Sequence, residues 1–150
     1  MIPKFIVQMR RINWVLLELI ILGVILRAEY SQAGVMAVGA RMGLEAFNFI
    51  QGYYDPNLIS FHVGVRYVNI AIIGLFFFLF GVSEEVLLAQ PFITSLLSII
   101  LIYYLGKKMF SREVGFLAAF LLAIYPSDIL NATILESDSI MALFIGVGMY

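Results

Sequence analysis

The sequence predicts an all-α, polytopic helical membrane protein. Of its 150 residues, 63% are hydrophobic and only 13% are charged, and the mean hydropathy is +1.01, far above the apolar content of an ordinary soluble domain. The long runs are apolar on every face, whereas the strands of a transmembrane barrel alternate apolar and polar residues. The absence of cysteine excludes disulfides, thiolate metal sites and cysteine nucleophiles.

Residues 12–26 form the first predicted span. Lys4, Arg10 and Arg11 precede it, so the positive-inside rule places the N-terminus in the cytoplasm. The run ends without a small-residue cleavage site, which indicates an uncleaved signal anchor. Glu18 lies inside the span. Such an acid is either functional or faces another helix in a neutral or hydrogen-bonded state.

Two helices are expected in the external segment that follows. Residues 61–81 are apolar and are interrupted only by Arg66 and Asn69. Residues 30–50 are too weakly apolar to span, so they predict an amphipathic helix on the outer surface, with Arg41 and Glu45 on its polar side. The apolar side of that helix comprises Ala33, Met36, Ala37, Ala40, Leu44 and Phe47.

The second span is predicted over 84–104. Ser83 is the expected N-cap, and the acids that follow it suit a helix N-terminus. Pro91 would kink the helix or lie in its first turns. Gly106 is the expected C-cap, ahead of two lysines that suit the last turn.

Two further spans complete a single transmembrane module, 1–150. One covers 112–125 and stops near Pro126, and the other covers 139–150. Because the chain stays apolar to Tyr150, and a terminal carboxylate in hydrocarbon is costly, we expect this module to be the N-terminal part of a longer protein.

Charge sets the expected topology. Lys107, Lys108 and Arg112 form a short basic loop that should be cytoplasmic, like the N-terminus. An even number of crossings must therefore separate them, so we predict that 61–81 does not cross and is a re-entrant or juxtamembrane helix. This topology puts six of the nine Lys and Arg inside and eight of the ten Asp and Glu outside. The acidic segment 125–138, with Asp128, Glu136 and Asp138, is then external.

Several polar residues are candidates for chemistry. Glu29, directly after the first span, is either a base or metal ligand in a shallow pocket, or a dipole partner or N-cap for a helix starting near Tyr30. Glu136 and Asp138 point the same way if the segment is extended, so they could bind Mg²⁺ or Mn²⁺. Alternatively, Asp138 caps the helix from Ser139.

His62 and Arg66 share a face if they lie on a helix and could contact a phosphate, or His62 is a polar spot in a packed helix. The few basic residues lie mostly at the inner membrane face, so nothing indicates nucleic-acid binding.

The order of these features resembles the N-terminal module of GT-C superfamily glycosyltransferases, such as the protein O-mannosyltransferases and aminoarabinose transferases. Glu29-Tyr30 matches the acidic pair and tyrosine of the first external loop, although Ala28 replaces the usual first Asp. Glu136 and Asp138 fall at the second external acidic motif. Three further stretches carry the resemblance: Leu79-Phe-Gly-Val-Ser-Glu84, Tyr103-Tyr-Leu-Gly-Lys-Lys-Met-Phe110 and Ser111-Arg-Glu-Val-Gly-Phe-Leu-Ala-Ala-Phe-Leu-Leu-Ala123.

The resemblance implies transfer of a sugar from a polyprenyl-phosphate carrier to an acceptor protein or lipid at the outer membrane face. It makes Glu29 the base, with Tyr30 beside it in the substrate site. His62 and Arg66 would contact the phosphate. Glu136 and Asp138 would hold a divalent cation or shape the pocket near the leaving group. The alternative function is a non-catalytic membrane subunit or a transporter segment.

Overall fold

The computed structural model describes residues 14–30, 37–53, 67–132, 134–135 and 138–150. These residues form helices and no strand, which confirms the all-α class. The helices are, in chain order, α2 (Trp14–Glu29), α3 (Ala37–Ile50), α5 (Tyr67–Phe80), α6 (Glu84–Met109), α7 (Arg112–Ala123), α8 (Pro126–Asn131) and α9 (Asp138–Met149).

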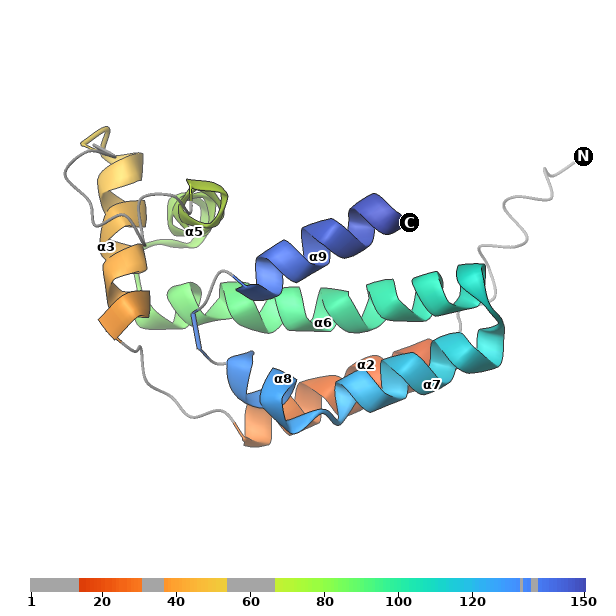
Figure 1. The fold of residues 1–150 in the computed structure, drawn as a ribbon. Coiled ribbons are helices and arrows are strands. Elements are labelled where there is room, and N and C mark those ends of the chain that lie inside the picture. The colour runs from red at the N-terminus through yellow and green to blue at the C-terminus, as the bar shows by residue number, and fades with distance from the viewer. Residues whose placement is uncertain (1–13, 31–36, 54–66, 133, 136–137) are drawn as a thin grey trace, which may run out of the picture.

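The helices are arranged around α6, which is the longest described helix. Helices α2 and α7 pack against α6 and against each other, and α9 packs on the opposite side of α6 (Figure 1). Helices α2, α6, α7 and α9 form one layer of helices. The C-terminal ends of α2 and α7 lie at the same end of this layer as the N-terminal ends of α6 and α9. At that end, α3 and α5 pack together and run across the direction of α6.

Helix α6 is the strongest membrane span. At about 1.5 Å per residue, its 26 residues cover roughly 39 Å, which exceeds a hydrocarbon core of about 30 Å. Among the described residues, it alone is both long and apolar enough to cross a bilayer. Its N-cap is Ser83 as predicted, because the Ser83 hydroxyl accepts a hydrogen bond from the Val86 amide at 3.3 Å. Pro91 lies inside the helix, and the helix continues to Met109.

The predicted C-cap of α6 is wrong. Gly106 lies within the helix and faces Gly115 of α7, where a Cβ built on Gly106 would meet the Gly115 Cα at 2.7 Å. The missing side chains therefore allow the two helix backbones to touch. Ser111 caps α7 through a 3.3 Å bond from the Val114 amide.

The acidic segment after α7, for which no helix was predicted, contains a short one. Helix α7 ends at Ala123, and α8 begins at Pro126. Proline suits the first helical position because its missing N–H would have no intrahelical partner there. The acidic segment therefore starts with a short helix.

The predicted polar side of the surface helix is wrong at Glu45, whereas Arg41 is exposed as expected and the exposed Leu44 and Phe47 leave the predicted apolar side open to the membrane. In α3, Leu44 is 58% exposed, whereas Glu45 of the predicted polar side is 8% exposed. The buried face contains Met42 and Ala46, which pack with Ile70, Ile73, Phe77, Leu87 and Leu135. Helix α5 covers this face, and the apolar side around Leu44 is left for other surroundings such as lipid.

A second core lies between α2, α6 and α7. Its buried residues are Leu16, Leu19, Ile99, Tyr103, Ala119 and Ala123. Because small alanines of α7 face the larger side chains of α2 and α6, α7 approaches both helices closely. This core ends at the polar cluster described next.

Candidate functional site

A buried arginine in the last turn of α2 joins polar groups from four helices. Arg27 is 0% exposed, and its Nε donates to the Ser95 Oγ of α6 at 2.7 Å. Its Nη1 donates to the backbone oxygens of Gly23 in α2 at 3.1 Å and Ala123 in α7 at 3.2 Å. Its Nη2 donates to the Asp128 Oδ2 of α8 in an ion pair. We call these five residues the Arg27 cluster.

Asp128 gives the cluster its negative charge. The Ser95 hydroxyl donates to Asp128 Oδ2 at 2.6 Å while accepting from Arg27, so the three side chains bond to one another. The Asp128 side chain is 21% exposed, and the carboxylate therefore lies between the guanidinium and the surface. Its position in the first turn of α8 also suits the helix dipole.

The cluster fixes α8 to the helices beneath it. A guanidinium removed from water needs a negative partner and acceptors for its donors, and the planar fork of Arg27 reaches several acceptors at once. Removing one partner of a fully buried ion pair costs about 3–5 kcal/mol. The partial exposure of Asp128 places this pair toward the lower end of that range.

No sequence pattern predicted this cluster. The predicted first span ends at Leu26 and Asp128 had no predicted role, whereas α2 continues through Arg27 to Glu29. The partners lie 68 and 101 residues from Arg27 in the chain, so no local spacing connects them. The available signal was two opposite charges, each next to a long apolar run.

The predicted base lies just beyond the cluster. Glu29 is the last residue of α2, two positions after Arg27, and both Glu29 and Tyr30 are exposed. The alternative role of Glu29 as the N-cap of a helix starting near Tyr30 is wrong, because Glu29 is itself the last residue of α2. The dipole at a helix C-terminus opposes a carboxylate, so helix stability does not explain this acid.

The other predicted site residues are placed only in part. His62, Arg66 and Glu136 lie outside the described residues. Asp138 is the first residue of α9, and its side chain is also outside the description. Because Asp138 is helical, the extended geometry assumed for Glu136 and Asp138 does not hold at that residue. The described part of the chain contains no group of three His, Cys, Asp or Glu able to hold a metal, so the cation site stays a prediction.

Buried polar residues also line one side of α6. Gln90 donates to the Thr94 hydroxyl at 3.2 Å, and that hydroxyl donates to the Gln90 carbonyl at 2.8 Å. Ser98 donates to the Thr94 carbonyl at 3.0 Å. These contacts satisfy the Thr94 and Ser98 hydroxyls within the helix itself, as the interior of a membrane requires, whereas the buried Gln90 Oε1 has no hydrogen-bond partner among the described residues.

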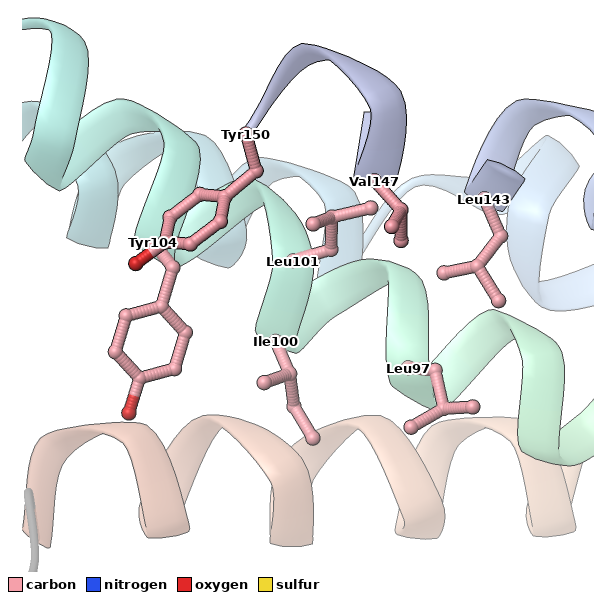
Figure 2. A pocket seen from close by; sticks show the side chains of 7 residues that line it. All are labelled: Leu97, Ile100, Leu101, Tyr104, Leu143, Val147 and Tyr150. Atoms are coloured by element: carbon pink, nitrogen blue, oxygen red, sulfur yellow. The ribbon is translucent and has the colours of Figure 1, made fainter. Parts of the chain in front are cut away.

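A separate groove runs between α6 and α9. It has a volume of about 350 Å³ and is lined by five aliphatic side chains and the rings of Tyr104 and Tyr150. Figure 2 shows Leu143 and Val147 of α9 facing the α6 residues across it. This groove offers contacts for a hydrocarbon chain but no acid or base among its lining residues, so it is not the reaction site.

Comparison with known proteins gives one match. Residues 67–150, more than half of the chain, match the family model for dolichyl-phosphate-mannose-protein mannosyltransferase. The matched segment includes Ser95 and Asp128 of the Arg27 cluster. Neither the curated proteins nor the solved structures provide a match.

Proposed function

Because the chain belongs to the dolichyl-phosphate-mannose-protein mannosyltransferase family, of the GT-C type, we propose that it transfers a sugar from a polyprenyl-phosphate carrier to an acceptor at the outer membrane face. The proposed base is Glu29. The observation that carries this role is an exposed carboxylate held at a helix end where it does not stabilise the helix. The acceptor is a hydroxyl of a protein or lipid.

The distribution of charge supports the outer face. Glu29 and Asp128 lie at one end of the helix layer, and α6 begins at the same end with Glu84 and Glu85. The opposite end carries the basic turn between α6 and α7. By the positive-inside rule, the basic turn faces the cytoplasm, so the acidic end faces outward.

The orientation of α5 supports the same topology. Since α5 runs across α6 (Figure 1), it lies along the membrane surface when α6 crosses the membrane. Together with α3 it forms the expected juxtamembrane layer.

The proposed reaction is a substitution at the anomeric carbon of the donor sugar. Glu29 accepts the proton of the acceptor hydroxyl, and the acceptor oxygen forms a bond to the anomeric carbon. The bond from that carbon to the phosphate oxygen breaks, and the phosphate leaves with its electron pair on the lipid carrier. His62 and Arg66 are the proposed phosphate contacts. Glu136 and Asp138 are the proposed cation ligands, and a cation there would offset charge on the leaving phosphate.

The test is sugar transfer by the Glu29→Gln variant of the full-length protein, with a polyprenyl-phosphate-linked mannose as donor. Loss of a general base lowers kcat by about 10²- to 10⁴-fold. Glu84→Gln is the matched control, because it removes an exposed carboxylate from the same end of the layer, and it should leave kcat unchanged. Wild-type transfer by Glu29→Gln would refute the assignment. A non-catalytic subunit instead predicts that neither Glu29→Ala nor Asp138→Ala affects transfer by its partners.

A further inference from the structure

We propose that Ser95 and Asp128 are positioning residues that act through Arg27. They hold the end of α2, which bears Glu29, at the distance from the acidic segment that sugar transfer requires. This inference rests on the proposed function. It goes further by assigning roles to two residues that do not themselves need to contact the substrate. The carrying observation is that a buried guanidinium on the helix that ends in Glu29 donates to Asp128 of the acidic segment and to Ser95, which itself donates to the same Asp128 oxygen.

The first step concerns Glu29. It ends α2, and the turn that contains it would fray if nothing held it, because terminal turns leave carbonyls without intrahelical partners. Arg27 sits in that turn and bonds to Ser95 and Ala123 on two other helices. These bonds hold the last turn of α2, so the cluster sets the backbone position from which the Glu29 side chain extends.

The second step concerns α8. A helix of six residues is too short to be stable alone, so its position depends on contacts with its neighbours. It packs against α2, α6 and α7, and its charged contact is the Asp128 carboxylate, which accepts hydrogen bonds from Arg27 and Ser95. The acidic segment thus begins at an anchored point.

The third step concerns the rest of the acidic segment. Leu135 and Ile140 are buried, with relative exposures of 2% and 5%. They flank Glu136 and Asp138 in the sequence, so these two acids are bracketed by residues anchored in the core. Because Asp128 holds α8 to Arg27, the end of α2 and the start of the acidic segment are both positioned by the buried Arg27 guanidinium.

The experiment compares Ser95→Ala with Ser98→Ala in the full-length protein. Both changes remove a serine hydroxyl from α6, but Ser98 bonds only to its own helix among the described residues. A displacement of about 1 Å in a reacting group can lower the rate up to about 10²-fold. We therefore expect Ser95→Ala to lower kcat 10- to 100-fold, with the KM for the donor within twofold and the apparent Tm near that of Ser98→Ala.

A double variant separates positioning from other roles. If Ser95 acts through Glu29, Ser95→Ala should cost little further activity in a Glu29→Gln background, because residues acting as one unit are not additive. Equal losses in both backgrounds would overturn the inference, as would wild-type kcat in Ser95→Ala while Glu29→Gln is inactive. The latter result leaves the proposed function standing, whereas an active Glu29→Gln variant removes both.

A second variant covers the case in which Ser95→Ala does not fold. Arg27→Lys keeps a positive charge beside Asp128 but loses the planar fork that reaches Ser95 and Ala123. We expect Arg27→Lys to lower kcat as much as Ser95→Ala does. We also expect it to cost little further activity in the Glu29→Gln background. Wild-type kcat in Arg27→Lys would overturn the inference.

Discussion

The contact between α6 and α7 makes a quantitative prediction about stability. Gly115 of α7 has no room for a side chain, because a Cβ there would lie 2.5 Å from the Tyr103 carbonyl oxygen and 2.7 Å from the Lys107 nitrogen. Ordinary contacts begin near 3.4 Å, so the first of these is about 0.9 Å too short. Both obstacles are backbone atoms, which cannot move aside as a side chain can.

Gly115→Ala should therefore push the two helices apart. Overpacking of this kind costs about 1–3 kcal/mol, whereas alanine gains only about 0.5–1 kcal/mol over glycine in a helix interior. The net loss is up to about 2.5 kcal/mol. At 2–4 °C per kcal/mol for a chain of this length, the apparent Tm should fall by up to about 10 °C.

Thermal unfolding of the purified protein in detergent measures this effect. Gly148→Ala in α9 is the matched control, because nothing lies within 4 Å of its added Cβ, and it should have a Tm equal to or slightly above wild type. Gly115→Ala should also lower transfer, since α7 carries the Ala123 carbonyl of the Arg27 cluster. The packing argument is refuted if Gly115→Ala melts at or above the temperature of Gly148→Ala.

The remaining predictions concern a helix cap and the topology. Ser111→Ala removes the hydrogen bond from the Val114 amide and should destabilise α7 by about 0.5–2 kcal/mol. A Tm for Ser111→Ala equal to that of the Gly148→Ala control would contradict this prediction. Because the chain has no cysteine, Val82→Cys and Phe110→Cys provide single labels in the two exposed turns that flank α6. A membrane-impermeant thiol reagent should label only Val82→Cys on intact cells, and the reverse pattern, or labelling of both, would refute the topology.

Local signals predicted much of the fold. Ser83 was recognised as an N-cap because the side chain of a cap bonds within its own turn, so a few neighbouring residues contain the whole interaction. The start of α6 at Glu84 was predicted for the same reason. Pro126 was interpreted only as a stop signal, although proline also begins helices, and α8 was missed.

The errors arise where distant segments meet. Gly106 has the sequence context of a C-cap, but it lies inside α6, where its missing side chain allows close contact with Gly115 of the next helix. In α3, an apolar side chain such as Leu44 can meet lipid as well as protein, so periodicity did not identify the face that α5 covers. The Arg27 cluster depends on residues contributed by four helices. Glu29, by contrast, was predicted as a candidate because an acid directly after an apolar run is a local signal.

The separation of Arg27 and Asp128 has a consequence for biosynthesis. The two residues are 101 positions apart, so at about 5–20 residues per second Asp128 is made roughly 5–20 s after Arg27. During that interval α2 enters the membrane without its counter-charge, at a translocon cost of up to about 3.5 kcal/mol for an arginine at the helix centre and less near the end. The arrival of α8 neutralises this charge, so the nascent module can lock its helices together only after α6 and α7 have been inserted.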